Sequence, residues 1–553
     1  MSKGTAQSDL TTDVVVVGAG AAGLSAALGA ASTGRDVVVL EGAPVIGGCT
    51  SKSSGGVFIP NNRFLRERGV QDGRDDAVRF MSRVGFPQDY DPDAERYGLS
   101  ELDHQLIVTY YDEASRIVDL LEEEGILTLA PMRSISQDPR GFPSYHSEFE
   151  EERVDYGRTL NPQDWAGVEG YGVELITQLA RGVQRHGVRL FTDHQVVEIL
   201  EGDGVVTGVV VGTPAGRRRI LASGGVVFAS GGFTHNRELV ERHLPGFVPG
   251  GGAAANSTGA FVGLAERLGA DFANMDSAWW AQLPVEMALQ SREQPQLVFV
   301  PTGDSMIMVN AEGRRVVNEK DVYHDRGKIH FVRDADGGQP NKLLFWIFDQ
   351  PLLDQPPHHS RWPLPPAGED ADFLIKAATL EELEGKIAEH LAAIADDVDG
   401  FSLQPSFGAN LPGTIERFNQ FAEVGVDEDF NRGGRPIERD WGGPGRVGHQ
   451  PNITMYPIAD TGPYYCVIMA AATLDTNGGP RVDVEGRVLR PGGEPIPGLY
   501  GAGNCVASPA GHGYWSGGGT LGPAVVFGYR AGRAAAGGEL PAAATPVPAG
   551  AAA

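Results

Sequence analysis

The sequence predicts an α/β protein with two lobes, a discontinuous Rossmann-like βαβ domain and an inserted α+β lobe. A strand, a glycine turn and a helix follow one another at 13–32, which is the opening of a βαβ unit. A similar strand-and-glycine pattern returns at 498–504, and the region between 283 and 460 is rich in Trp and Pro with few such turns. At about 100–200 residues per domain, 553 residues are expected to form two or three domains.

The first βαβ unit carries the pattern of a dinucleotide site. A β-branched strand runs into a Gly-Ala-Gly-Ala-Ala-Gly turn, and the next apolar run ends in Glu41, eighteen residues after Gly23. This spacing is close to that of a carboxylate that binds a ribose. Gly18 permits the tight turn, Gly20 lets the backbone approach a pyrophosphate, and Gly23 allows the helix to pack closely on the strand. The candidate contacts of this unit are Gly18, Gly20, Ala21, Ala22, Gly23 and Glu41.

Later segments extend this predicted site. Residues 45–56 are small or carry hydroxyls, and such a loop suits a flavin and its diphosphate. The strand pattern at 220–228 ends in a second glycine turn, and the strand at 498–501 also leads into glycines. The further candidate contacts are Gly48, Cys49, Thr50, Ser54, Gly55, Gly56, Val197, Ser230, Gly231, Gly232, Gly503, Asn504, Gly519 and Leu521.

The places where the strand-and-glycine pattern recurs give the predicted domain limits. Residues 10–282 and 461–538 are expected to form the two parts of the dinucleotide-binding domain, and 283–460 the substrate lobe. The Ala/Pro-rich end, 539–553, is expected to be a disordered tail.

Composition narrows the class of protein. The 45 basic and 72 acidic side chains leave a formal charge of −27, which repels nucleic-acid phosphates. There is no long apolar run, so no membrane span is expected. Cys49, Cys466 and Cys505 have neither a CxxC nor a CxxxxC spacing, so neither disulfides nor a thiolate metal site are expected. With no signal-peptide pattern at the N-terminus, a cytoplasmic protein is predicted, its oligomeric state left open.

Four motifs together resemble one superfamily. The glycine turn after the first strand, Gly47-Gly-Cys-Thr50 with Ser53-Ser-Gly-Gly56, Ala229-Ser-Gly-Gly-Phe233 and Gly498-Leu-Tyr-Gly-Ala-Gly-Asn504 are similar to the fumarate reductase/3-ketosteroid dehydrogenase flavoproteins. The resemblance covers roughly 12–538 and implies FAD as the cofactor, with a smaller lobe that closes the substrate over the flavin. The succinate dehydrogenase branch attaches its flavin through a His in the segment after the ribose acid. Because residues 42–56 contain no His, FAD is expected to be non-covalent.

Two tyrosines indicate the branch. Residues 306–319 resemble the superfamily hairpin that ends in Asn-Glu, and four residues later the fumarate reductases carry an Arg. This chain has Tyr323 there, as the 3-ketosteroid dehydrogenases do, and the resemblance implies that it removes a proton beside a ketone. The segment 511–524 is similar to the signature in which a Tyr and the Gly four residues later hold the ketone oxygen. Tyr514 and the Gly518 amide are the corresponding candidates.

Three positions depart from this pattern or map loosely onto it. Trp515 is bulky and is expected to shorten the pocket. Ser516 is similar to the serine of the variant that acts on the 4,5-bond of saturated ketosteroids. A third family tyrosine on an early helix corresponds to Tyr110 or Tyr111, with Tyr110 the candidate for the site. An ordinary tyrosine pKa of about 10 is too high for a base at neutral pH, so Tyr323 needs neighbours that lower its pKa or relay its proton.

The expected function is FAD-dependent desaturation of the C–C bond adjacent to a ketone in a small apolar cyclic substrate. The 1,2- or 4,5-bond of a 3-ketosteroid is the leading substrate, and a smaller cyclohexanone-like ketone is the competitor. An ene-reductase of the fumarate reductase type and a flavin-binding sensor are the remaining alternatives. No second GxGxxG motif is present for a nicotinamide domain, so electrons are expected to leave through a diffusible acceptor, quinone-like or oxygen.

Overall fold

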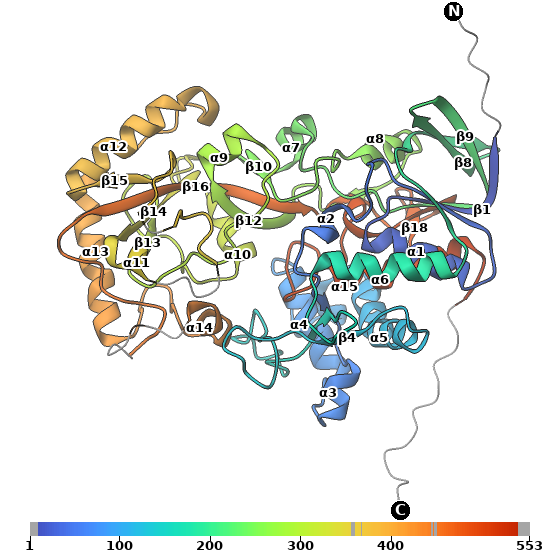
Figure 1. Ribbon diagram of the computed structural model, residues 1–553, viewed down its shortest axis with the longest axis horizontal. Coiled ribbons are helices and arrows are strands. Elements are labelled where there is room, and N and C mark those ends of the chain that lie inside the picture. Colours follow the sequence, from blue (N-terminus) through green and yellow to red (C-terminus); the bar gives the residue numbers. More distant parts are fainter. Residues whose placement is uncertain (1–8, 356–359, 367, 444–445, 447–450, 540–553) are drawn as a thin grey trace, which may run out of the picture.

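The computed structural model describes residues 9–355, 360–366, 368–443, 446 and 451–539. They form two lobes, and the long strand β16 (Tyr464–Thr476) extends from one lobe toward the other (Figure 1). Apart from Glu539, the predicted tail 539–553 lies outside the described residues. Within the described part of the chain, no helix is both long enough and apolar enough to cross a bilayer.

The first lobe is built on a mostly parallel sheet. Its strands are β1 (Leu10–Val17), β2 (Val37–Leu40), β6 (Arg189–Phe191), β7 (Gln195–Gly202), β8 (Val205–Thr213), β9 (Gly216–Phe228), β18 (Arg487–Leu489) and β19 (Pro495–Gly501). They follow the order β18-β19-β9-β1-β2-β6, with β7 and β8 forming a hairpin on β9. Val15 lies between Val38 and Val226, and all three are fully buried. Such burial on both faces explains why these strands are continuous apolar runs.

Helices cover this sheet and approach it closely at glycines. Helix α1 (Ala21–Ala31) packs on α15 (Leu521–Ala535) and α6 (Gly172–Arg185), and α15 packs on α5 (Glu101–Glu123). Gly18 has φ +104°, and a Cβ there would lie 2.3 Å from the Ala229 carbonyl oxygen. A Cβ at Gly23 would lie 1.9 Å from the Gly18 carbonyl oxygen. The structure therefore confirms the predicted tight turn at Gly18 and the close packing at Gly23.

The second lobe is built on a mostly antiparallel sheet around β16. Its order is β10-β16-β14-β13, with β12 and β15 also paired to β16. These strands are β10 (Gly250–Gly251), β12 (Ala278–Pro284), β13 (Met306–Val309), β14 (Leu343–Asp349) and β15 (Ile375–Ala377). Helices α12 (Leu380–Ala393) and α13 (Phe407–Val424) pack on it through buried residues such as Leu383 and Phe407. Because β10, β16 and most of β12 belong to this sheet, the second lobe takes in strands from outside the predicted limits 283–460.

Shorter elements complete the fold. A three-stranded sheet, β3-β5-β4, and a two-stranded one, β11-β17, lie outside the two main sheets. The remaining bounds are α2 (Gly48–Ser51), β3 (Val57–Phe58), α3 (Arg63–Glu67), α4 (Arg74–Gly85), β4 (Leu129–Pro131), β5 (Thr159–Pro162), α7 (Arg237–His243), α8 (Ala260–Arg267), β11 (Phe272–Ala273), α9 (Val285–Gln290), α10 (Tyr323–Lys328), α11 (Gln350–Asp354), α14 (Pro436–Gly442) and β17 (Gly479–Pro480). Helix α10 packs on β12, so its first residue, Tyr323, lies beside the lobe junction.

Candidate active site

A cavity of about 1020 Å³ lies where the two lobes meet. Its walls include the turn after β1, the loop after β2, the start of α15 and second-lobe residues 295–297. In sheets of this kind ligands bind at the carboxyl ends of the strands. A single small-molecule site has roughly 300–1,000 Å³, so this cavity is large for one small ligand.

Most of the predicted dinucleotide contacts line this cavity. They are Gly18, Gly20, Ala21, Ala22, Glu41, Gly48, Cys49, Thr50, Ser54, Gly56, Ser230, Gly231, Gly503, Asn504 and Leu521. The Glu41 carboxylate accepts hydrogen bonds from the amides of Ala19 and Ala43, both at 2.9 Å. A Cβ added at Gly20 would have no protein atom nearer than 3.7 Å, so this face of the turn is open to the cavity.

The residues present fit a bound dinucleotide. The N-terminus of α1 opens on the cavity, with the Ala21 amide donating to Thr50 Oγ1 at 3.2 Å. Helix N-termini attract phosphate through their amides and dipole. Asn161 also lines this cavity, and its buried Oδ1 accepts no hydrogen bond from the described residues. A buried acceptor of this kind is normally satisfied by a ligand or water.

Five predicted contacts do not line the cavity, namely Gly23, Gly55, Val197, Gly232 and Gly519. Val197 is 40% exposed, and it is the preceding Val196 that lines the cavity, because successive side chains of a strand point to opposite faces. A Cβ at Gly55 would lie 2.7 Å from the Tyr171 backbone, and one at Gly232 would lie 2.2 Å from Thr476 Oγ1. These glycines allow close packing behind the cavity wall.

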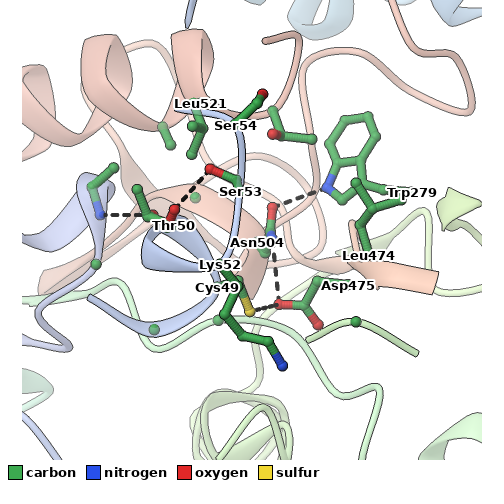
Figure 2. A pocket seen from close by; sticks show the side chains of 18 of the residues that line it. Cys49, Thr50, Lys52, Ser53, Ser54, Trp279, Leu474, Asp475, Asn504 and Leu521 are labelled. Carbon is green, nitrogen blue, oxygen red and sulfur yellow. Dashed lines mark hydrogen bonds between the residues drawn. The ribbon is translucent and has the colours of Figure 1, made fainter. Parts of the chain in front are cut away.

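Asp475, which sequence reasoning missed, ties several parts of the wall together (Figure 2). Its Oδ2 accepts hydrogen bonds from the Gly232 amide at 2.9 Å, Asn504 Nδ2 at 3.3 Å and the Cys49 thiol at 3.5 Å. Asn504 Oδ1 in turn accepts a hydrogen bond from Trp279 Nε1 at 3.0 Å. Burial, with the nearby Asp475 carboxylate, raises the pKa of Cys49 to about 12, so the thiol stays protonated and serves as a donor.

Three tyrosines meet at another part of the cavity wall. The Tyr145 hydroxyl donates to the Tyr323 hydroxyl at 3.3 Å, and the ring centroids of Tyr323 and Tyr514 are 5.5 Å apart. Tyr323 begins α10 in the second lobe, whereas Tyr145 and Tyr514 come from loops of the first. The structure therefore brings together the two predicted tyrosines, which are far apart in the sequence, and adds a third.

The surroundings of the tyrosine hydroxyls disfavour their ionised forms. Burial raises the pKa of Tyr323 well above the ordinary value of 10, and the neighbouring Tyr145 and Tyr514 raise it further. Burial also raises the pKa of Tyr145 well above 10. In this structure the surroundings thus do not lower the pKa of Tyr323, and the Tyr145 hydroxyl is the group placed to stabilise or relay its charge.

Two groups close to Tyr323 in sequence do not assist it. His324 Nδ1 accepts a hydrogen bond from the Trp280 amide at 3.2 Å, and Nε2 donates to the His512 carbonyl at 3.0 Å. Burial lowers the pKa of His324 to about 3, so this ring is neutral. Lys320 donates to two backbone carbonyls, at 2.5 and 2.6 Å. Both side chains therefore support the backbone.

The loop that carries Tyr514 places Gly517 and Gly518 on the cavity wall and directs Trp515 and Ser516 elsewhere. Gly518 has φ +81°, and a Cβ there would lie 2.6 Å from the Phe58 amide nitrogen. Ser516 is buried and does not line the cavity. Trp515 is fully buried, and its Nε1 donates to a carbonyl of α4 at 3.0 Å. The expectation that Trp515 shortens the pocket is wrong, because its indole packs into the first-lobe core.

Neither tyrosine of the early helix reaches the cavity. Tyr110 is fully buried, its hydroxyl donates to the Phe58 carbonyl, and its ring centroid lies 5.1 Å from that of Trp515. Tyr111 donates to a backbone carbonyl on another side of α5. The prediction of Tyr110 as a site residue is therefore not supported, because this face of α5 packs into the core. Tyr145, from a loop with no motif, lies at the site.

Aromatic residues surround the tyrosines. Trp441, on α14, has its ring centroid 5.4 Å from that of Tyr145 and 6.2 Å from that of Tyr323. The apolar and aromatic lining also includes Ile135, Phe142, Trp279, Leu297, Phe299, Val300 and Trp362. The signal for the second-lobe members was the Trp-rich composition of 283–460, which gives no individual positions.

Helix α10 brings no arginine to the cavity wall beside Tyr323. Arg326, three residues after Tyr323, is fully buried and donates to Gln282 Oε1 at 2.6 Å and to the Val298 carbonyl at 2.7 Å. It does not line the cavity. Among the described residues, no three His, Cys, Asp or Glu side chains form a group that could hold a metal ion.

The cavity and its glycine turn define a dinucleotide-binding protein, and comparison with known proteins identifies the family as one of flavoproteins. The FAD binding domain family matches residues 13–521. The chain therefore belongs to this family, and FAD is its cofactor.

Several relatives are dehydrogenases of ketones by name, and others are fumarate reductases at 26–27% identity. A 3-oxosteroid 1-dehydrogenase of Mycobacterium tuberculosis is 32% identical, over 94% of this chain and 97% of that protein. A 4-oxocyclohexanecarboxylate 2-dehydrogenase of Sinomonas cyclohexanicum is also 32% identical, over 95% and 93%. The crystal structure of a 3-ketosteroid delta1-dehydrogenase from Sterolibacterium denitrificans in complex with 1,4-androstadiene-3,17-dione has a TM-score of 0.77 at 24% identity, covering 95% of this chain and 99% of that one. This last likeness shows the shared fold.

Proposed function

We propose that this chain is an FAD-dependent dehydrogenase that desaturates the C–C bond next to a ketone, with 3-ketosteroids as its substrate class. The observation that carries the proposal is the meeting of Tyr323, Tyr145 and Tyr514 on the wall of the cofactor cavity. The 32% identity to a 3-oxosteroid 1-dehydrogenase supports it. FAD is held non-covalently, since residues 42–56 contain no histidine.

In this proposal each tyrosine has a separate task. The Tyr514 hydroxyl and the Gly518 amide donate to the ketone oxygen and stabilise the charge of the enolate, at about 2.7–4 kcal/mol per donor. Tyr323, in its deprotonated form, takes the proton from the α-carbon and becomes neutral, and the Tyr145 hydroxyl stabilises the Tyr323 anion before the transfer by its hydrogen bond. The C=C bond forms as hydride leaves the β-carbon. FAD, when bound, supplies the hydride acceptor, and a diffusible quinone-like compound or oxygen then takes the electrons.

The lining favours an apolar substrate and the 1,2-bond. Ser516, the residue that suggested the 4,5-bond, lies off the cavity. The aromatic and aliphatic wall suits a polycyclic ketone, which gains by burying apolar area. A monocyclic ketone is the second candidate, because a 4-oxocyclohexanecarboxylate dehydrogenase is equally similar at 32%.

Anaerobic mixing with ketones tests the proposal. The oxidised holoenzyme is mixed with a 4-ene 3-ketosteroid and, separately, with 4-oxocyclohexanecarboxylate, and the flavin absorbance is followed. Bleaching by the steroid, with a 1,2-unsaturated product, is expected. Faster bleaching by the monocyclic ketone would move the substrate class to small rings. Reoxidation of dithionite-reduced enzyme by fumarate, with no bleaching by either ketone, would overturn the proposal in favour of an ene-reductase.

The rate of flavin reduction is expected to rise with pH throughout the range from about 6 to 10. Tyr323 must lose its proton to act as a base, and its pKa is held above 10, so the reactive fraction grows about tenfold per pH unit below that value. Stopped-flow traces with saturating ketone give this profile. A rate that levels off near pH 7 would show that the base is another group or that ligand binding lowers the pKa.

Replacing Trp441 by Leu is expected to shift preference toward larger ketones. The indole packs on Tyr145 and Tyr323, so its removal opens space beside the reacting atoms. A monocyclic ketone loses contacts that a steroid can regain, and the ratio of kcat/KM for steroid over monocycle is expected to rise about tenfold. Trp165→Leu is the control, because that indole is 95% exposed. An unchanged ratio would remove Trp441 from the substrate wall.

A further inference from the structure

Arg435 connects the two lobes directly behind the tyrosines. It precedes α14 of the second lobe, and only 12% of its side chain is exposed. Its Nη1 donates to the Tyr145 carbonyl at 3.3 Å, its Nη2 to the Asp321 carboxylate, and its Nε to Glu438 Oε1 at 2.6 Å. One guanidinium thus binds the first-lobe loop that carries Tyr145 and two acidic residues of the second lobe.

The Asp321 contact fixes the start of the helix that begins with Tyr323. Asp321 lies two residues before Tyr323, and its Oδ1 also accepts the Val322 amide at 2.6 Å. Arg326, on α10 itself, donates to the Asp321 carbonyl at 2.6 Å. Because Val322 caps α10, a shift of Asp321 would move the first turn of this helix and the Tyr323 ring with it.

Arg435 and α14 also contact other residues of the first-lobe segment that carries Tyr145. Arg435 Nη1 also donates to Glu148 at 3.3 Å, three residues after Tyr145. On α14, the Asp440 carboxylate accepts the amides of Ile135 at 3.0 Å and Ser136 at 2.8 Å. Arg435 and α14 therefore contact the first lobe through residues that precede and follow Tyr145 in the sequence. Helix α14 lies on the side of its lobe nearest α4 and β4 (Figure 1).

We propose that Arg435 is a positioning residue that keeps the Tyr145 and Tyr323 hydroxyls within hydrogen-bond distance across the lobe junction. The inference rests on the proposed function and adds to it the residue that aligns the base with its partner. A planar guanidinium with several donors can hold three carboxylates and a carbonyl at once, and a lysine ammonium cannot reproduce that fork.

Arg435→Gln and Arg435→Lys test this role. Each is expected to slow anaerobic flavin reduction by the steroid about 100-fold, as a misplacement of about 1 Å does, while the FAD content and the steroid Kd stay within about threefold. Arg417→Gln is the matched control, because Arg417 is 53% exposed and pairs with Asp429 in the same lobe. If Arg435→Gln fails to fold, Arg435→Lys keeps the charge and the test. Wild-type rates in a folded variant would overturn the inference.

A double-mutant comparison separates positioning from general damage. In a Tyr323→Phe background, Arg435→Gln is expected to cost less than about threefold, because the hydroxyl that it aligns is already absent. A further 100-fold loss there would mean that Arg435 acts by another route.

A crystal structure of the variant gives a readout that needs no substrate. In Arg435→Gln, or in Arg435→Lys if only that variant folds, the two hydroxyls are expected to lie beyond hydrogen-bond distance, and an unchanged pair would overturn the inference. If no ketone reduces the wild-type flavin, the proposed function fails, and this distance still decides the role of Arg435.

Discussion

Replacing Tyr323 by Phe is expected to slow flavin reduction by ketone about 10²- to 10⁴-fold while FAD remains bound. The substitution removes the hydroxyl that takes the α-proton and the acceptor of the Tyr145 hydrogen bond. The ring keeps its packing against Tyr514 and Trp441, at centroid distances of 5.5 and 6.2 Å. Stopped-flow absorbance measures the rate, and the flavin-to-protein absorbance ratio measures cofactor content.

Tyr110→Phe is the control for this prediction. Tyr110 is a buried tyrosine of the first lobe, and this substitution likewise removes one hydroxyl, but the hydrogen bond that it loses goes to the Phe58 carbonyl away from the cavity. Flavin reduction in the Tyr110→Phe variant is expected to stay within about threefold of the wild-type rate, and its free energy of unfolding is expected to fall by about 0.5–1.5 kcal/mol. A Tyr323→Phe variant as fast as Tyr110→Phe would show that another group removes the proton.

Replacing Arg158 by Met is expected to lower the free energy of unfolding by about 3–5 kcal/mol. Arg158 is 4% exposed and donates to both Asp72 oxygens, at 2.9 and 2.8 Å, and to Glu152 Oε1 at 2.6 Å. The two carboxylates have side-chain exposures of 1% and 0%. Without the guanidinium they are left unpaired in the interior, which costs far more than the pair itself contributes. Urea unfolding followed by flavin release and by tryptophan fluorescence measures the change.

This buried ion cluster also supports the active-site loop. Glu152 accepts a hydrogen bond from Ser144 Oγ at 2.6 Å, one residue before Tyr145, so slower flavin reduction is expected together with the lower stability. Arg140→Met is the control, because Arg140 is 55% exposed and pairs with Asp138 at the surface. A surface pair of this kind contributes about 0–1 kcal/mol. Equal stability losses in the two variants would contradict the assignment of a special role to the buried cluster.

Local chemistry accounts for the features that could be predicted from the sequence. The turn at Gly18 and the packing at Gly23 depend on residues within one βαβ unit, and both predictions are confirmed by the approach of backbone atoms. Within one motif, Tyr514 and Gly518 both line the cavity, whereas Ser516 and Gly519 do not. Glu41 lies at the predicted place because strand and helix lengths fix its distance from the turn.

Side-chain direction in loops and on a two-sided strand was less predictable. Val197 was one position off, since only the docking of the β7–β8 hairpin decides which face of β7 meets the cavity. Trp515 lies next to Tyr514, yet it points into the core. The predicted limits of the second lobe missed β16, because strand pairing across 100 or more residues leaves no local signal.

By itself, the sequence determined a glycine turn, an acidic residue at the spacing expected of a ribose carboxylate, and two tyrosines in recognisable surroundings. These features are set by conformations that only glycine adopts and by spacings within single strand–turn–helix units. The tertiary structure alone decided that Tyr145 rather than Tyr110 joins Tyr323, and that Arg435 links the segments that carry them. The reason is that the Tyr145–Tyr323 and Arg435–Tyr145 contacts join residues from different lobes, and such neighbours are fixed by the packing of whole elements.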